Sequence, residues 1–426
     1  MKIAFFTDTY LPQVSGVATS IRILSEELQA MGHHVYIFTT TDPQAKESTE
    51  QIMRLPSIPF VSFKDRRIVV SGLLDAYERA KQLDLDLIHT HTEFGTGLLG
   101  KQIGKLLDIP VVHTYHTMYE DYLHYIAKGK IIRPSHVKQA TRAYCRHLSG
   151  IICPSQRVVD KLTEYEVISP LSIIPTGIQL QQFEEVSVSE ARYKVRQNWE
   201  ISEQTTLLLS LSRLSYEKNI QAVLKALPKI VEKQPDTCLM ICGKGPYQEE
   251  LEQLVHSLSL RDYVLFTGEI QPEEVAKYYR AADIFVNAST SESQGLTYIE
   301  ALAARIPMVV KTSPYVASLM RDESLGRLFE DEPTLSAQVL DVIALKLEPS
   351  ESVVQEILTE ISSQTFARRV LEFYESAISY HHYFIKKNKT MKKARVPSEK
   401  DLSQMTDEHE SMLKANLWFQ KMRKHK

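Results

Sequence analysis

The chain has 426 residues, of which 43% are hydrophobic and 24% charged, and its formal net charge is −3. This composition excludes a largely disordered or collagen-like chain, and the length indicates two to three domains of about 150 residues. Because no apolar run reaches the roughly 18 residues that cross a bilayer and the start carries no secretory pattern, we expect a cytoplasmic protein.

The charged residues are unevenly distributed along the chain. Residues 380–426 hold twelve Lys or Arg against five Asp or Glu. Between Asp121 and Asp160 there are seven basic residues and no acidic one. Two basic islands in a mildly acidic chain are typical of a protein that meets a polyanionic surface.

Short apolar runs alternate with helical patterns through the first 175 residues. A helix is predicted over 16–31, and strands are predicted over 2–6, 35–39, 87–90, 110–114 and 150–153. Runs this short that are apolar throughout are typical of a parallel sheet covered on both faces. The alternation predicts right-handed βαβ units and a doubly wound domain over 1–177.

The pattern pauses over 178–200, which is polar and is predicted to be a linker. It then restarts, with a helix predicted over 218–231 and strands over 206–212, 238–242, 263–266, 284–287 and 308–311. A second doubly wound domain is therefore predicted over 201–365. A long helix is expected over 350–380, and 366–426 is predicted to return toward the first domain and to end in a basic tail.

Two doubly wound domains that face each other would place the carboxyl ends of both sheets around one cleft, where ligands bind. The first loop there ends in Ser15-Gly16, and a glycine at a helix N-terminus lets a phosphate approach the free N–H groups. Taken alone, this loop also suits a plain N-cap. This loop lacks the second and third glycines of a dinucleotide fingerprint. Gly243-Lys244-Gly245 fails the same test, because Gln248 stands where the third glycine would be.

Two further loops carry charge. Arg213 and Lys218 follow the first strand of the second domain, where they could clamp a diphosphate or simply be solvated. Glu292 follows the 284–287 strand, and Gly295 precedes a helix whose first N–H groups could meet an anion. Glu300 lies a turn inside that helix among apolar residues, where its carboxylate suits a ribose diol, although both glutamates could also belong to a helix surface.

Together these segments resemble a retaining glycosyltransferase of family four, which has the GT-B fold. The resemblance covers residues 1 to about 375 and rests on the Gly16 loop, the segment 113–117, Arg213 with Lys218, and the Glu292–Glu300 pair. Within the family, segments 291–300, 90–94 and 115–122 are most similar to enzymes that glucosylate 1,2-diacylglycerol in Gram-positive bacteria.

The resemblance implies a role for each position. His116, Glu292, Arg213 and Lys218 would act in catalysis, because stabilising the leaving phosphate is the main task of such an enzyme. His116 would hydrogen-bond the donor sugar. The donor-binding positions would be Gly16, Val17, Arg213, Lys218, Ile270, Gln294, Gly295, Leu296, Thr297 and Glu300. The donor would be UDP-glucose and the acceptor diacylglycerol.

Two positions depart from the family pattern. Arg305 and Ser293 stand where glycine is common. A side chain at positive φ in place of the first glycine would cost about 1 kcal/mol.

Metal-ligating residue types do not form a metal-site pattern. The four cysteines are unpaired in spacing and indicate buried small side chains. The Asp-Leu-Asp segment 84–86 precedes a strand and is interpreted as surface. His89 and His91 could form a metal pair, but no third ligand is obvious, and His113 and His116 favour a structural or substrate role. We expect no essential metal and no cofactor apart from the donor substrate.

The island 122–159 interleaves isoleucines with basic residues, a pattern that suits an anionic bilayer interface and also a solvated helix face. The predicted membrane contacts are Lys128, Lys130, Ile131, Ile132, Arg133 and Lys138. The basic tail could be a second anchor or a disordered segment. We expect a peripheral protein on the inner face of the cell membrane.

Three rival functions remain open. The first is a transferase of the same fold with a soluble or already glycosylated acceptor. The second is a nucleotide-sugar-binding protein without turnover. The third, a nucleic-acid binder, lacks a recognised nucleic-acid-binding fold to accompany its charge, so nucleic acid is not an expected partner.

Overall fold

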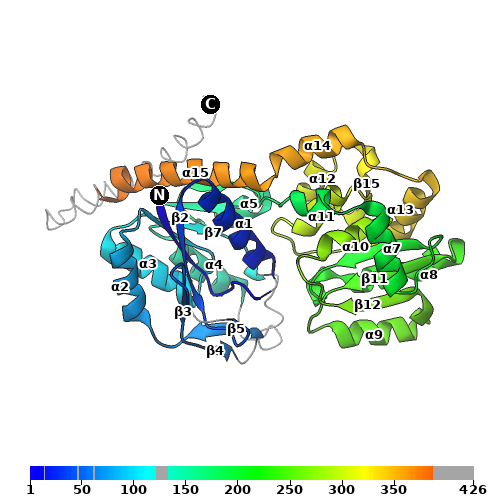
Figure 1. Ribbon diagram of the computed structural model, residues 1–426, viewed down its shortest axis with the longest axis horizontal. Coiled ribbons are helices and arrows are strands. Elements are labelled where there is room, and N and C mark those ends of the chain that lie inside the picture. The colour runs from blue at the N-terminus through cyan, green and yellow to red at the C-terminus, as the bar shows by residue number, and fades with distance from the viewer. Residues whose placement is uncertain (14, 46–47, 61–62, 121–132, 387–426) are drawn as a thin grey trace. The chain divides into compact units, whose positions relative to one another are not determined.

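The computed structural model describes residues 1–13, 15–45, 48–60, 63–120 and 133–386, and the chain divides into two units (Figure 1). Unit 1 comprises Met1–Thr176 and Phe366–Lys426, and unit 2 comprises Gly177–Thr365. Among the described residues, no helix is both long enough and apolar enough to cross a membrane.

Unit 1 is built on a seven-stranded sheet whose neighbouring strands all pair in parallel, in the order β3-β2-β1-β6-β7-β8-β9. Its strands are β1 (Lys2–Phe6), β2 (His34–Thr40), β3 (Ile52–Leu55), β6 (Leu87–Thr90), β7 (Val111–Thr114), β8 (Gly150–Cys153) and β9 (Leu171–Ile173). β4 (Ser57–Phe60) and β5 (Phe63–Val69) form a separate two-stranded antiparallel sheet. All five strands predicted for this half are confirmed.

Helices cover both faces of this sheet. They are α1 (Gly16–Ala30), α2 (Leu73–Leu83), α3 (Gly95–Leu107), α4 (Pro134–Cys145), α5 (Gln156–Glu164) and α15 (Ser363–Tyr380). Side chains alternate along a strand, so Ile3 and Phe5 enter one core, while Ala4 and Phe6 enter the other. Residues 366–377 of α15 complete the first of these cores, so the end of the chain forms part of unit 1.

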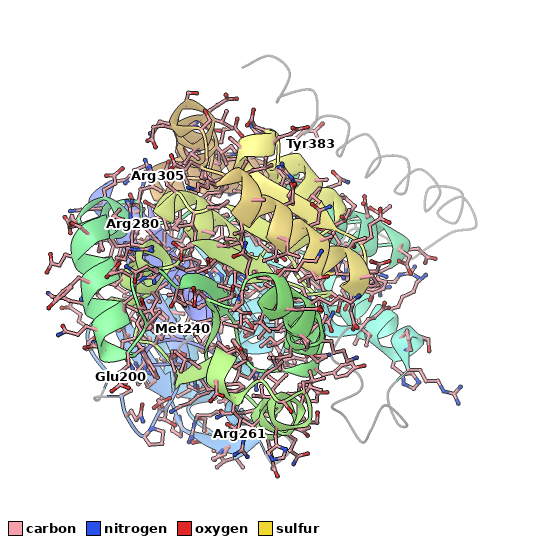
Figure 2. All side chains as sticks on the ribbon, turned by 90° about the vertical axis from the view of Figure 1, so that its right-hand side faces the viewer. Glu200, Met240, Arg261, Arg280, Arg305 and Tyr383 are labelled. Carbon is pink, nitrogen blue, oxygen red and sulfur yellow. The ribbon has the colours of Figure 1, made fainter. Side chains whose placement is uncertain are left out.

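Unit 2 has a six-stranded parallel sheet in the order β12-β11-β10-β13-β14-β15. Its strands are β10 (Thr206–Leu211), β11 (Thr237–Cys242), β12 (Val264–Gly268), β13 (Ile284–Asn287), β14 (Met308–Lys311) and β15 (Gly326–Phe329). Its helices are α6 (Gln181–Glu184), α7 (Val188–Asn198), α8 (Ile220–Lys233), α9 (Gln248–Ser257), α10 (Val275–Ala281), α11 (Leu296–Ala304), α12 (Pro314–Leu319), α13 (Glu332–Leu345) and α14 (Glu351–Glu360). Met240 of β11, labelled in Figure 2, is fully buried in its core.

Both sheets have the strand order of a doubly wound fold, which confirms the predicted fold class. The direction in which successive strands are added to the sheet reverses between β1 and β6 in unit 1, and between β10 and β13 in unit 2. In such sheets ligands bind at the carboxyl ends of the strands that flank this reversal. The loops that follow β10 and β13 are those that carry Arg213, Lys218 and Glu292.

The structure differs from the expectations in two segments. The predicted linker 178–200 contains α6 and α7, and α7 packs on α10 within unit 2. The helix expected over 350–380 is broken, because Ile178 engages the backbone around Ser362: its N–H donates to Ile361 O, and its carbonyl accepts from Ser363 N. The Ser362 hydroxyl then accepts from Thr365 N and begins α15.

Arg305 (labelled in Figure 2) has the left-handed conformation expected from the family's glycine, with φ of 59° at the end of α11. Its guanidinium donates two hydrogen bonds of 2.7 Å to the carboxylate of Glu351 on α14. This bidentate pair offsets part of the conformational cost and ties α11 to α14.

Candidate active site

The two charged loops of unit 2 are joined by hydrogen bonds at the carboxyl ends of β10 and β13. The backbone N–H and hydroxyl of Thr290 both donate to Glu217 O, at 3.1 and 3.2 Å. Asn219 Nδ2 donates to Ala288 O at 3.2 Å. Loops that the sequence separates by about 70 residues therefore form one structural element.

This element brings together two of the predicted catalytic residues. Lys218 Nζ lies 2.7 Å from Glu292 Oε1, and the two side chains are only 16% and 19% exposed. An ion pair this sheltered from water is screened less by salt than a surface pair. Arg213 lies on the same loop with an exposed side chain. Lys218 and Arg213 thus lie on one loop at the carboxyl edge of the sheet.

The Gly243-Lys244-Gly245 segment supports the Arg213 loop, a role that sequence reasoning missed. Leu214 N donates to Lys244 O at 3.0 Å. A Cβ on Gly243 would lie 1.9 Å from Ser212 O, and one on Gly245 would lie 2.1 Å from Leu214 O. Only glycine permits this approach. Two glycines directly after a strand, two positions apart, were the available signal.

The start of α11 lies beside Glu292. Gly295 has φ of 77°, and a Cβ there would meet the Tyr298 ring at 2.5 Å. As the N-cap residue it offers the first turn of α11 no side-chain oxygen, so the first N–H groups of that helix receive no cap from Gly295. Gln294 is buried directly before it. The predicted anion-binding residues 294–297 therefore surround one helix N-terminus.

Glu300 lies further inside α11, as predicted. Its Oε2 accepts from the hydroxyl of Tyr279, which is 3.0 Å away on α10. Desolvation raises the pKa of Glu300 to about 7, and the bond from Tyr279 opposes that shift. The carboxyl group is therefore near its midpoint of ionisation at neutral pH, and its ionised form can accept hydrogen bonds from a diol.

Glu300 should make the stability of the protein depend on pH. A carboxyl whose pKa is higher in the folded chain binds more protons when folded, so stability falls as pH rises from about 4.5 to about 7. We expect Glu300→Gln to remove this contribution. Urea unfolding at pH 5 and pH 8 should show the variant gaining stability relative to the parent at pH 8. An equal difference at both pH values would contradict the raised pKa.

The remaining predicted donor contact of unit 2, Ile270, follows β12. It is half-buried and packs against the core of the unit. Gly268, which precedes it, has φ of 74° and turns the chain out of the strand. Ile270 thus lies at the same carboxyl edge as the charged loops, two strands along the sheet from β10.

In unit 1, Gly16 and Val17 begin α1. Ser15 caps this helix by accepting from Ala18 N at 3.1 Å, which agrees with the plain N-cap interpretation. The preceding loop is fixed by Arg54, whose Nη2 donates to Leu11 O at 2.8 Å. Gly16 is exposed. Its contact with a phosphate stays a prediction.

His116 belongs to a cluster of four histidines that the sequence did not reveal. The cluster lies at the ends of β6 and β7 and consists of His89, His91, His113 and His116. The Nδ1 atom of His91 and the Nε2 atom of His116 are 3.2 Å apart. Burial lowers the pKa of His116 to about 3 and the pKa of His91 well below its ordinary value, so both rings are neutral.

His113, in the same cluster, is hydrogen-bonded through both ring nitrogens. His113 Nδ1 faces Thr90 O at 2.8 Å, so this nitrogen must carry hydrogen. Its Nε2 lies 3.1 Å from Glu93 Oε1, and Tyr119 donates to the other oxygen of that carboxyl. The parallel register that aligns β6 with β7 explains why histidines 22 to 27 residues apart meet. Among the described residues, no group of three or more ligands could hold a metal ion.

The predicted membrane island is only partly described. Lys128, Lys130, Ile131 and Ile132 lie outside the described residues. Arg133 is exposed at the start of α4. Lys138 and Arg142 both pair with Glu166, at 3.1 and 2.6 Å. The absence of acidic residues within the island therefore does not leave all of its basic residues unopposed, because Glu166 is distant in sequence and adjacent in the fold.

Comparisons with known proteins identify the class. Residues 14–182 match the model of Glycosyltransferase Family 4, and residues 192–356 match that of Glycosyl transferases group 1. The alpha-monoglucosyldiacylglycerol synthase of Streptococcus pneumoniae is 48% identical over 90% of this chain and 87% of its own length. The enzyme of that name from Acholeplasma laidlawii is 33% identical over 87% and 94%. Sucrose-phosphate synthase from Thermosynechococcus elongatus has a similar structure, with a TM-score of 0.72 at 21% identity over 89% and 99% of the two chains.

The protein is therefore a glycosyltransferase, and the predicted GT-B fold is confirmed. The chain belongs to glycosyltransferase family 4, in the branch of its alpha-monoglucosyldiacylglycerol synthase relatives.

Proposed function

We propose that this enzyme transfers glucose from UDP-glucose to the 3-hydroxyl of 1,2-diacylglycerol with retention of configuration, giving alpha-monoglucosyldiacylglycerol. The observation that carries the proposal is the sheltered Lys218–Glu292 pair on the joined loops at the winding reversal of unit 2. The proposed acceptor, diacylglycerol, is based on the two relatives that are named for this product and match nearly the whole chain.

The proposed chemistry follows from the charges at this edge. Arg213 and Lys218 bind the pyrophosphate of the donor and stabilise the negative charge that grows on it as the glycosidic bond breaks. Glu300 accepts hydrogen bonds from the ribose. Glu292 and the start of α11 hold the sugar and the outer phosphate, and His116 hydrogen-bonds the sugar. The acceptor hydroxyl attacks from the face of the leaving group, and a phosphate oxygen takes its proton.

The acceptor side of the proposal draws on exposed apolar residues of unit 1. Ile58 and Ile68 are cross-strand partners in the β4–β5 hairpin and are 54% and 44% exposed. Val69 of that hairpin lies next to Gly95, at the start of α3. We define the apolar surface of unit 1 as Ile58, Ile68, Val70, Leu73, Leu74, Phe94 and Leu98. Clustered exposed apolar side chains are typical of lipid or partner contacts.

We therefore propose that the apolar surface of unit 1, together with basic residues of 122–138, attaches the enzyme to the inner face of the membrane. Apolar burial supplies affinity that salt does not screen, and the basic residues add attraction to anionic lipid. This arrangement would place the acceptor, which is confined to the bilayer, within reach of the enzyme.

The function is tested by incubating the full chain with labelled UDP-glucose and mixed vesicles that contain diacylglycerol. Labelled monoglucosyldiacylglycerol is the expected product. A transferase with a soluble acceptor would label no lipid and would stay in the supernatant when the vesicles are sedimented. A nucleotide-sugar-binding protein would bind UDP-glucose and turn over none of it.

Activity should survive an excess of EDTA. The clamp formed by Arg213 and Lys218 supplies fixed positive charge where a divalent cation would otherwise be required. The initial rate of lipid labelling should change by less than about twofold, within the ordinary scatter of such rates. Loss of activity that Mn²⁺ or Mg²⁺ restores would show that the clamp does not replace a metal.

A further inference from the structure

In the histidine cluster of unit 1, two rings are hydrogen-bonded to other groups through both nitrogens, and the remaining two rings are bonded to each other. His89 is bonded through both nitrogens, to Tyr374 Oη and to Thr114 Oγ1, each at 2.7 Å. His113 is bonded through both nitrogens as well. In the His91–His116 pair, each ring uses one nitrogen for the other. This pair is the part of the cluster whose protons are not fixed by other groups.

The second nitrogen of each ring in the pair has a different environment. Nε2 of His91 is buried and has no hydrogen-bond partner among the described residues. It lies in a ring that packs against Phe5 and His89, with ring centroids 4.9 and 4.0 Å apart. His116 is half-buried, and the described residues offer its Nδ1 no hydrogen bond. Nε2 of His91 is therefore enclosed in the core, whereas Nδ1 of His116 is the nitrogen of the pair that can contact a ligand.

A neutral imidazole carries a single hydrogen, so only two arrangements connect these rings. If His116 donated from Nε2, the hydrogen of His91 would be on its buried Nε2 with no acceptor. If His91 donates from Nδ1, its buried Nε2 has only a lone pair, and the hydrogen of His116 lies on its half-buried Nδ1. A buried N–H without an acceptor is the rarer defect in proteins.

We infer that His91 is a positioning residue: it donates from Nδ1 to Nε2 of His116 and holds His116 as the tautomer whose hydrogen is on Nδ1. His116 then presents an uncharged N–H donor through that atom. Such a donor suits a neutral oxygen, as in a sugar hydroxyl, rather than the anionic phosphates that Arg213 and Lys218 suit. This deepens the proposed function, on which the identity of the ligand rests.

The proton arrangement is tested on the full chain without turnover. Protein labelled with ¹⁵N at histidine is examined by NMR, in which protonated and unprotonated ring nitrogens have well-separated resonances. The His116 signals are assigned by their loss in His116→Gln. We expect Nδ1 of His116 to carry the hydrogen and Nε2 to be unprotonated. A hydrogen on Nε2 would overturn the inference whether or not the protein transfers glucose.

Two substitutions separate hydrogen bonding from packing. His91→Asn keeps an N–H donor near the position of Nδ1, and His91→Leu fills the space without one. We expect the asparagine variant to retain the Nδ1 tautomer and the leucine variant to give a mixture. With UDP-glucose as substrate, the leucine variant should lose about tenfold in kcat/KM, the worth of one hydrogen bond, and the asparagine variant much less.

His89→Gln is the matched control. His89 is equally buried and packs on His91, but it makes no bond to His116. This variant should unfold at lower urea concentration and leave the tautomer of His116 unchanged. If His89→Gln moves the tautomer as much as His91→Leu does, or if the asparagine and leucine variants behave alike, His91 acts only through packing and the inference fails.

Discussion

Alanine in place of Arg213 or Lys218 is expected to lower the rate of glucosyl transfer by about 10²-fold or more. Removal of one fixed charge from a developing anion typically has an effect of this size. Lys218 should have the larger effect, because its Nζ is sheltered beside Glu292, whereas Arg213 is exposed. Initial rates at saturating UDP-glucose, together with UDP affinity from calorimetry, measure both losses.

Lys225→Ala is the matched control for this experiment. Lys225 lies on α8, and its 3.5 Å pair with Glu332 is exposed on both sides. An exposed pair of this kind contributes roughly 0–1 kcal/mol to stability, so activity should be unchanged. Normal rates in both the Arg213→Ala and Lys218→Ala variants would show that the donor site lies elsewhere.

The ion pair adds a second requirement to this test. Without Lys218, the half-buried Glu292 carboxylate loses this ion pair, which can destabilise the joined loops. The double change Lys218→Ala with Glu292→Gln removes that charge. Because Glu292 is also proposed to hold the donor sugar, the double variant is compared with Glu292→Gln alone. If destabilised loops alone caused the loss of rate in Lys218→Ala, these two variants would have equal rates. We expect the double variant to be slower, since the positive charge is still missing.

Sequence alone could predict the strands and the order of the functional loops, because these depend on local patterns. A buried parallel strand such as 87–90 or 284–287 is a short apolar run, whatever lies around it. The loop after each such strand reaches the carboxyl edge by topology. Arg213, Glu292 and Glu300 were predicted as site residues for this reason, together with the family resemblance.

Features that depend on tertiary contact were not predictable. Glu166 opposes Lys138 and Arg142 only because α5 and α4 flank the same strand, so a charge count over 122–159 overestimates the free positive charge. The histidine cluster requires the register between β6 and β7. The break near Ser362 requires Ile178, which lies more than 180 residues earlier and pairs with its backbone.

The glycines show the same limit in another form. Gly243 and Gly245 fail the dinucleotide spacing, yet the collision of a Cβ with Ser212 O or Leu214 O makes both necessary. The dinucleotide spacing rule detects glycines that one type of ligand requires. It does not detect glycines that are required because another backbone segment approaches closely. Arg305 is the opposite case, since a non-glycine residue keeps the left-handed turn with the help of Glu351.

Attachment to vesicles should depend more on the apolar surface of unit 1 than on the predicted basic contacts. Leu74 and Leu98 are 72% and 55% exposed. Burial of one leucine side chain contributes roughly 1.5–3 kcal/mol, so Leu74→Glu with Leu98→Glu should weaken vesicle binding by about 10²-fold or more. Transfer to vesicle lipid should fall in parallel, while slow hydrolysis of UDP-glucose in solution should persist. Sedimentation of the protein with vesicles measures the binding.

Leu345→Glu is the control, because Leu345 is similarly exposed, at 56%, but lies on α13 of unit 2. Its binding should match that of the parent. The triple change of Lys128, Lys130 and Arg133 to Glu tests the basic contacts separately, and its effect should shrink as salt is added, since ions screen exposed charges over roughly 8–10 Å. The effect of the leucine pair should not shrink, because the hydrophobic effect is not screened by salt. If the triple variant loses all vesicle activity and the leucine pair none, the basic segment alone attaches the enzyme.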